Sequence, residues 1–255
     1  MTTLDLTPAP GAAPFPRMVL AQAGAEARAI LRNGEQLLLT LIIPVLLLVG
    51  FSLAPLVDVG EGPRVDFLTP GVLALAIMST AFTGQAIATG FERRYGVLKR
   101  LGATPLSRTG LLLAKTLAVV GVELLQAAVI VAVALALGWQ PRGSVGAAVL
   151  LVLLGTAAFS GLGLLMAGVL RAEATLAAAN LVYLVLLGCG GVIFPLSVFP
   201  DSVEPALALL PISALTGGLR AVLAAGAALP LGAAAVLVAW AALTLALASR
   251  TFRWE

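Results

Sequence analysis

The side chains that could do chemistry in this chain are few. Its 255 residues include no histidine and one cysteine, Cys189, which stands in an apolar run. A histidine-based metal site, proton relay or catalytic triad is therefore excluded, and no disulfide can form within the chain. The segment closest to a phosphate-binding loop, Thr109–Thr116 (TGLLLAKT), has no glycine at the first and sixth positions of that motif. Any ATP used with this protein must bind another polypeptide, and we expect Lys115 to extend to a membrane interface instead.

Glu123 is the one carboxylate deep inside a long apolar stretch. Ionisable groups within a membrane are costly and usually face the interior of a helix bundle or a wet cavity. Gln126 follows three residues later and shares the helix face of Glu123. The pair could line a transport route or form a structural hydrogen bond to another helix, with Gln85 or Asn180 as the partner. We favour the structural role and treat all four residues as candidate intramembrane polar residues.

A polar, basic island, Phe91–Arg108 (FERRYGVLKRLGATPLSR), lies between two long apolar stretches. It holds five lysine and arginine residues against one acid, Glu92. Each lysine or arginine at the centre of a membrane costs about 2.5–3.5 kcal/mol on insertion scales, so the island must protrude from one side. Setting the topology would by itself explain this charge, but the spacing of the residues suggests a further role.

Within the island, Glu92–Leu101 has the pattern of an amphipathic helix of about two and a half turns. Tyr95, Leu98 and Leu101 fall near one face, and Gly102 then acts as a helix stop. Such a helix, parallel to the membrane, is a docking element for a soluble partner, and we favour this interpretation. The residues expected to contact the partner are Glu92, Arg93, Tyr95, Gly96, Leu98, Lys99, Leu101 and Pro105.

Membrane helices must position these residues. The chain is 60% hydrophobic and 11% charged, with a mean hydropathy of +1.09, whereas soluble domains are about 25% charged. A bilayer core of about 30 Å needs roughly 20 apolar residues as helix, and six stretches qualify. The predicted fold class is an all-α polytopic membrane protein with six transmembrane helices, at residues 37–57, 68–90, 110–138, 145–170, 175–194 and 229–249.

The distribution of lysine and arginine predicts the orientation. With both termini in the cytoplasm, 12 of the 15 basic residues lie inside and 3 outside, as the positive-inside rule requires. The polar island is then cytoplasmic. Lysine is scarce beside abundant alanine, leucine, glycine and arginine, which suggests a GC-rich bacterial genome and hence a bacterial plasma membrane.

The N-terminal part of the chain precedes the first span. Residues 1–16 are proline-rich and predicted to be disordered, and residues 17–255 are expected to form one membrane domain. Residues 17–36 have amphipathic helical spacing. This spacing indicates an interfacial helix on the membrane surface or, as the alternative, a merely solvated helix.

Prolines interrupt residues 195–228, and proline breaks a helix by removing a backbone donor. We expect short extracellular, re-entrant helices that dip into the outer leaflet or cap it. Irregular backbone at that depth must be covered by protein or line a wet cavity. The candidate residues of an extracellular gate are Pro195, Phe199, Pro200 and Pro211.

Three segments carry a family resemblance: Phe91–Leu117 (FERRYGVLKRLGATPLSRTGLLLAKTL), Phe194–Leu223 (FPLSVFPDSVEPALALLPISALTGGLRAVL) and Leu31–Val49 (LRNGEQLLLTLIIPVLLLV). In their order and spacing they resemble the permease subunits of type-2 ATP-binding-cassette (ABC) exporters. The first is similar to the family's coupling-helix loop, the second to its proline-marked extracellular region, and the third to its interfacial helix and first span. The daunorubicin-resistance-like branch fits better than the polysaccharide-export branch.

The resemblance implies a half-transporter that pairs with a second permease copy, expected as a homodimer, and with two copies of a separate ABC ATPase that bind ATP and Mg. It also implies that this chain is no enzyme by itself. Its role would be outward movement of an amphipathic drug, lipid or glycolipid by alternating access, as in antibiotic resistance. The alternative is a secondary transporter or an intramembrane enzyme. The sequence lacks the clustered catalytic groups of such an enzyme and the inverted repeats and paired midplane charges of such a transporter.

Overall fold

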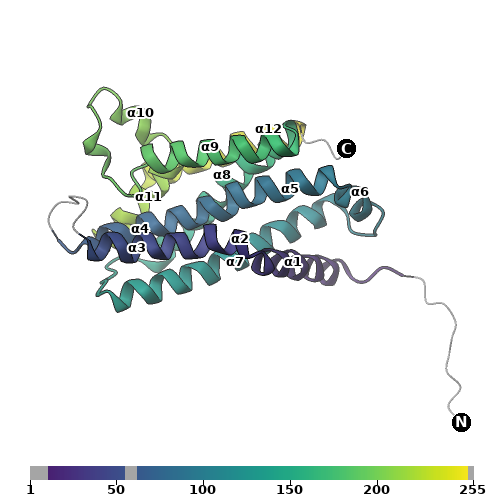
Figure 1. Ribbon diagram of the computed structural model, residues 1–255, viewed down its shortest axis with the longest axis horizontal. Helices are drawn as coiled ribbons and strands as arrows, with labels where there is room; N and C mark the ends of the chain where they lie inside the picture. Colours follow the sequence, from purple (N-terminus) through teal and green to yellow (C-terminus); the bar gives the residue numbers. More distant parts are fainter. Residues whose placement is uncertain (1–10, 55–61, 252–255) are drawn as a thin grey trace, which may run out of the picture.

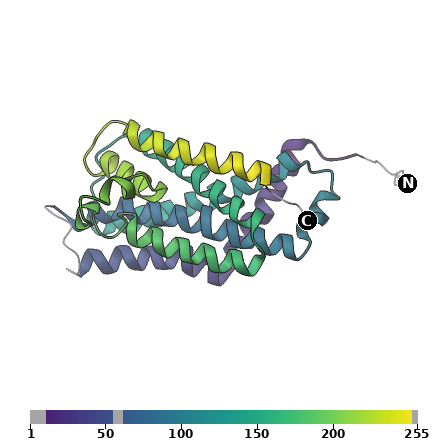
Figure 2. The ribbon, with the colours of Figure 1, turned by 90° about the horizontal axis from the view of Figure 1, so that it is seen from above.

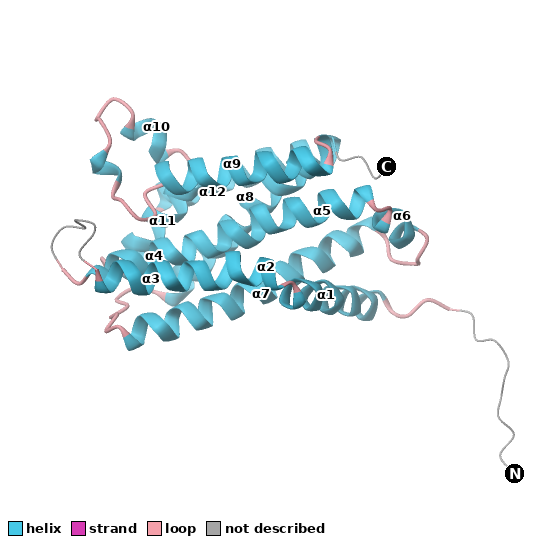
Figure 3. Cartoon of the chain, in the orientation of Figure 1, coloured by secondary structure: helices cyan, strands magenta, loops and turns pink. Residues whose placement is uncertain are grey.

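The computed structural model describes residues 11–54 and 62–251, and these residues form helices and loops with no strand (Figure 3). Among the described residues, five helices are long and apolar enough to cross a membrane: Arg64–Arg94, Thr109–Ala136, Val145–Val169, Ala172–Cys189 and Leu231–Thr251. A shorter apolar helix, Thr40–Leu53, lies where the first span was predicted. The protein is therefore an all-α, multi-pass membrane protein, as its composition predicted.

The first predicted span corresponds to α2, η1 and α3, the second to α4, η2 and α5, and the remaining four to α7, α8, α9 and α12. The segments η1 and η2 are π-helical, and η3 is a single 3₁₀ turn. The elements in chain order are α1 (Phe15–Arg32), α2 (Gly34–Leu37), η1 (Leu38–Ile42), α3 (Ile43–Leu53), α4 (Arg64–Ile77), η2 (Met78–Gly84), α5 (Gln85–Arg94), α6 (Val97–Gly102), α7 (Arg108–Ala136), α8 (Val145–Val169), α9 (Ala172–Cys189), η3 (Leu196–Val198), α10 (Glu204–Ala208), α11 (Pro211–Leu223) and α12 (Leu231–Thr251).

Several helix ends differ from the predictions; the second span, for example, runs from Arg64 to Arg94 and not from residue 68 to residue 90. α1 begins at Phe15, so the end of the predicted disordered segment is helical, while residues 1–10 lie outside the described residues. α3 ends before Ala54, which is extended (φ −95°, ψ 128°) because the proline that follows disfavours helical backbone. Residues 55–57 of the predicted first span lie outside the described residues. α9 ends at Cys189 and not at residue 194, since the chain turns at Gly191 with φ +70°.

The helices form one bundle whose two ends differ (Figure 1, Figure 2). α1, α6 and the C-terminal end of α12 lie at one end, which we call the α6 end. α10 and α11 lie at the opposite end, which we call the α11 end. The second span is central, because 89% of its apolar stretch is buried, against 22% for α9 and for α12.

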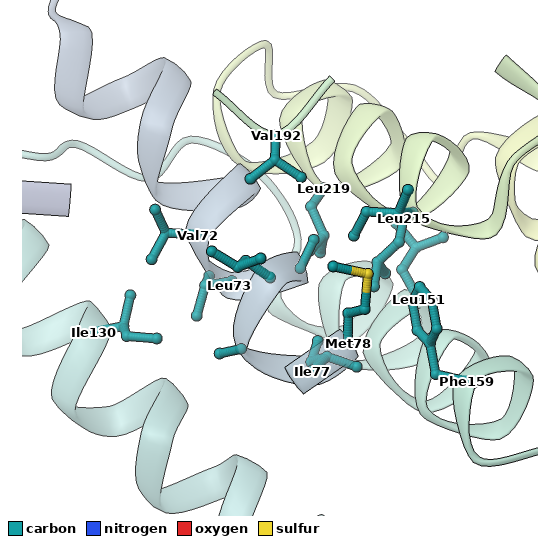
Figure 4. Packing of buried hydrophobic residues seen from close by; sticks show 14 of the residues in the cluster. Val72, Leu73, Ile77, Met78, Ile130, Leu151, Phe159, Val192, Leu215 and Leu219 are labelled. Carbon is teal, nitrogen blue, oxygen red and sulfur yellow. The ribbon is translucent and has the colours of Figure 1, made fainter. Parts of the chain in front are cut away.

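The hydrophobic core packs around the middle of the second span. Figure 4 shows Met78 of η2 among Leu151 and Phe159 of α8 and Leu215 of α11, and all four side chains are fully buried. Gly163 of α8 lies directly against this span, since a Cβ atom there would be 2.8 Å from the carbonyl oxygen of the Phe82 backbone. The close contact holds α8 against η2, so that a shift of one displaces the other.

Candidate functional site

The predicted docking helix is broken in the structure. α5 includes Glu92 and ends at Arg94, and Gly96 then takes a left-handed conformation with φ +67°. α6 begins directly after this glycine. The prediction of one continuous helix from Glu92 to Leu101 was wrong, because a glycine with left-handed backbone ends a helix.

The exposed face of α6 also differs from the predicted one. Tyr95 is 61% exposed, and Lys99 and Pro105 are exposed as well, so these side chains can meet a partner. Leu98 is only 2% exposed and Leu101 is half-buried. Leu98 therefore anchors α6 to its own chain, contrary to the expectation that it contacts a partner.

Lys115 is the centre of a buried ion cluster at the α6 end. Its Nζ atom lies 2.6 Å from Glu92 Oε2 of α5 and 3.2 Å from Glu26 Oε1 of α1. The lysine is 7% exposed, so the expectation that it extends to the membrane interface was wrong. α1 packs along α7 and so brings the carboxylate of Glu26 to the ammonium group of Lys115. A buried charge requires such a partner. The cluster ties α1, α5 and α7 together.

The next two residues of α5 contact two further helices. Arg93 donates from Nη1 to the carbonyl oxygen of Gly168 (2.7 Å) and from Nη2 to that of Leu170 (2.6 Å). These carbonyls lie at the C-terminal end of α8, where a helix leaves acceptors unpaired and favours a cation. Arg94 forms an exposed ion pair with Glu173 at the start of α9. Arg93 was expected to contact a partner, and in the structure it caps a helix of its own chain.

Gln126 of α7 connects the first and second spans at their π-helical segments. Its Nε2 donates to the carbonyl oxygen of Thr40 (3.1 Å), and its Oε1 accepts from Thr80 Oγ1 (2.9 Å). Thr40 lies four residues before Pro44, which has no N–H to donate to that carbonyl. Thr40 belongs to η1 and Thr80 to η2, and π-helical segments are frequent at functional sites.

Glu123, which is 5% exposed, connects α7 to α8. Thr156 Oγ1 lies 2.6 Å from Glu123 Oε2 and 2.9 Å from the carbonyl oxygen of Val152. The Thr156 hydroxyl has one proton, so the Glu123 carboxyl oxygen and the Val152 carbonyl oxygen share this donor. Neither expected partner takes part. Gln85 is buried with no partner for its Oε1 among the described residues, and Asn180 is exposed on α9.

A cavity of about 420 Å³ lies between the first, second and fifth spans, in the half of the bundle nearer to α6. Asn180 lines this cavity, and so does Tyr183, whose hydroxyl oxygen accepts from Ser79 Oγ at 3.3 Å. Gln36 and Thr83 add further polar groups, and aliphatic side chains fill the space between them. Pockets of this mixed character suit ligands that have both apolar and polar parts.

The proline-rich segment at the α11 end forms separate short helices. Pro195 precedes η3, Phe199 and Pro200 follow it, and Pro211 begins α11. Phe199 is half-buried and Pro200 exposed, whereas Pro211 is buried. α11 thus enters the bundle, while η3 and α10 project from it (Figure 1).

Arg220 fixes α11 in this position. Its guanidinium donates to the carbonyl oxygens of Phe67 (3.0 Å), Gly191 (2.5 Å) and Val192 (2.7 Å). It also lies over the Phe67 ring, 3.5 Å from the ring centroid. α11 is therefore tied to α4 and to the chain that follows α9.

A family comparison decides between the classes that the sequence left open. The profile of the ABC-2 type transporter family matches residues 19–224, which include α6, the cavity and α11. The chain belongs to the ABC-2 type transporter family. No curated protein matches it at a significant level. This ABC-2 permease is thus the membrane component of an ABC transporter, and the family-level resemblance of its sequence is confirmed.

Several contacts of this ABC-2 permease were missed by sequence reasoning. Glu92 and Lys115 are charged residues near the ends of apolar helices, and that depth was the signal that they need partners, such as Glu26 of the amphipathic α1. Thr156 gave no signal, because a threonine in an apolar helix commonly bonds a carbonyl of its own helix.

Proposed function

We propose that this ABC-2 permease is the membrane half of an ATP-driven exporter that moves an amphipathic drug, lipid or glycolipid-like molecule outward. In this proposal two permease copies, as a homodimer, assemble with two ABC ATPase subunits, and ATP and Mg bind to the ATPase subunits. The α6 end faces the cytoplasm, because 12 of the 15 basic residues then lie inside. The membrane is a bacterial plasma membrane.

The main support for the proposal is the cavity between the first, second and fifth spans. Its volume of about 420 Å³ lies in the range of about 300–1,000 Å³ that is typical of sites for drug-sized molecules. Hydroxyl, amide and phenol groups line it together with alkyl groups, and no charged side chain does so among the described residues. Such a lining favours an amphipathic molecule with few charges over an ion.

The helices beside the cavity leave room for a second copy. Leu46 on the first span and Leu181 on α9 are 62% and 63% exposed, and both helices border the cavity. A second permease that covers these faces would enclose the two cavities between the copies. A leucine side chain that faces lipid has no free-energy cost, because lipid tails are as apolar as leucine. Association of the two permease copies must therefore depend on close packing and not on the hydrophobic effect.

Movement of α6 links the ATPase to the cavity in this mechanism. ATP binding closes the ATPase subunits, α6 follows them, and the membrane helices change from one packing to another. The substrate enters from the α6 half and leaves at the α11 end. There η3, α10 and α11, with Pro195, Phe199, Pro200 and Pro211, serve as the gate.

Transport by the permease and its ATPase in proteoliposomes tests the proposal, with ethidium and doxorubicin as probes. Tyr183→Ala should raise the KM for transport, since it removes a ring and a hydroxyl from the cavity. Leu243→Ala on α12 is the control, because this side chain is 55% exposed and does not line the cavity. Unchanged transport in both Tyr183→Ala and Asn180→Ala would contradict the proposed substrate site.

A further inference from the structure

The last three residues of α5 each contact a different helix directly before the chain turns into α6. Glu92 pairs with Lys115 of α7, which also holds Glu26 of α1. Arg93 caps α8, and Arg94 pairs with α9. One short segment thus connects α6 with four other helices.

We propose that Arg93 is a positioning residue of the transport cycle, and that its two hydrogen bonds to the end of α8 transmit the movement of α6 to the helices around the cavity. The proposal rests on the proposed function, because it assumes that an ATPase moves α6. Tyr95 and Gly96 alone separate α5 from α6. Leu98 anchors the chain after this turn, because it is buried in the bundle. Arg93 anchors the chain before the turn, because it is bonded to the end of α8.

Arg93 is a stronger connection than its neighbour. The Arg94–Glu173 pair is exposed, at 49% and 62% of the two side chains, and solvent screens such pairs. Arg93 is half-buried and makes two charge-assisted hydrogen bonds to carbonyls at one helix end. A guanidinium holds both acceptors in one rigid fork, so a shift of the end of α8 without α5 breaks both hydrogen bonds.

α8 is suited to pass this movement on. It packs along α12, and its Gly163 lies against the backbone of η2. Ser79 and Thr83 of η2 line the cavity. A displacement of α5 therefore reaches the cavity wall through two close contacts, the hydrogen bonds of the Arg93 side chain to the end of α8 and the backbone contact of Gly163 with η2.

The same substitution at adjacent positions provides the test: Arg93→Gln against Arg94→Gln. Each variant is co-expressed with the ATPase and assayed for ATPase association, ATP hydrolysis and ethidium transport. Arg93→Gln should keep association and hydrolysis but lower transport per ATP about tenfold, the factor that corresponds to about 1.4 kcal/mol. Arg94→Gln should stay within about twofold of the wild type, because its ion pair is exposed. Equal effects of the two substitutions would overturn the proposal.

Arg93→Lys supports the same test if Arg93→Gln fails to fold. An ammonium keeps the positive charge but cannot hold two carbonyls in the fixed geometry of a guanidinium. Transport per ATP should therefore fall between the values for the wild type and Arg93→Gln. Wild-type coupling in Arg93→Lys would show that charge alone suffices and that the fork to α8 transmits nothing.

Spin-label distances separate this inference from the proposed function. Labels at Ala103 and Val169, both exposed, report on α6 and on the end of α8, in a Cys189→Ser background. With a non-hydrolysable ATP analogue, the two labels should move together relative to a third label at Leu112 of α7. In Arg93→Gln the label at Ala103 should move alone. No movement in the wild type would contradict the ATP-driven function, whereas joint movement that persists in Arg93→Gln would contradict the inference.

Discussion

Gln126 donates a hydrogen bond to the carbonyl oxygen of Thr40, the carbonyl that Pro44 leaves without its usual helical donor. The same amide accepts from Thr80, so one side chain of the third span joins π-helical segments of the first and second. Lipid is as apolar as leucine, and polar contacts of this kind therefore help to select which helix faces meet. The sequence predicted which helix face Gln126 occupies, but only the packing of the helices shows that its partners are Thr40 and Thr80.

Gln126→Leu should lower the melting temperature in detergent, because it leaves two polar groups unpaired. The cost of an unpaired buried group is about 1–3 kcal/mol in soluble proteins, and membrane-buried hydrogen bonds average about 0.6 kcal/mol. In a Pro44→Ala background the backbone again has an N–H for Thr40, so Gln126→Leu should cost less there. Strictly additive losses in this double-mutant cycle would rule out the link between Pro44 and Gln126.

Glu123→Gln should fold and transport, since an amide oxygen can accept from the Thr156 hydroxyl as the carboxyl oxygen does. Glu123→Leu should reduce the yield of monodisperse protein in size-exclusion chromatography, because Thr156 then loses its partner across the helices. A well-folded Glu123→Gln protein that no longer transports would instead assign the function to the carboxyl group itself.

Lys115→Met should destabilise the protein strongly, because removal of one partner from a buried ion pair costs about 3–5 kcal/mol. Lys99→Met is the matched control, since Lys99 is exposed on α6. Adding Glu26→Gln and Glu92→Gln to Lys115→Met should recover part of the loss, as no buried charge then lacks a partner. Thermal unfolding measures all of these variants, and equal melting temperatures for Lys115→Met and Lys99→Met would contradict the buried cluster.

Tyr95→Ala and Leu98→Ala should have different effects. Tyr95 is exposed at the turn before α6, so its loss should weaken co-purification of the ATPase. Leu98 is buried, and truncation of a buried leucine costs about 2–5 kcal/mol, so its loss should lower the melting temperature. Weaker ATPase binding in a fully stable Leu98→Ala protein would instead place Leu98 at the docking surface.

The orientation can be tested by cysteine labelling in a Cys189→Ser background. Ala103→Cys follows α6 and should react with an impermeant maleimide only after the cells are permeabilised. Val203→Cys, 43% exposed at the α11 end, should react in intact cells. The reverse pattern would place both termini outside.

Much of the fold was predictable because it depends on local properties of the chain. The length of an apolar run predicts a spanning helix, as for α7, α8 and α12. Proline and glycine limit helices through their own backbone, as at Pro211 and Gly191. Charge density alone placed the polar island outside the membrane.

By itself, then, the sequence determined the all-α membrane fold, the approximate spans and the segment that protrudes at the α6 end. Only the tertiary structure decided the partners: Lys115 meets Glu26 across 89 positions, and Glu123 meets Thr156 across 33. Helical periodicity tells which face a residue occupies, but not which helix lies opposite that face. Leu98 shows the consequence, because one amphipathic pattern serves equally for docking to a partner and for packing against the chain's own bundle.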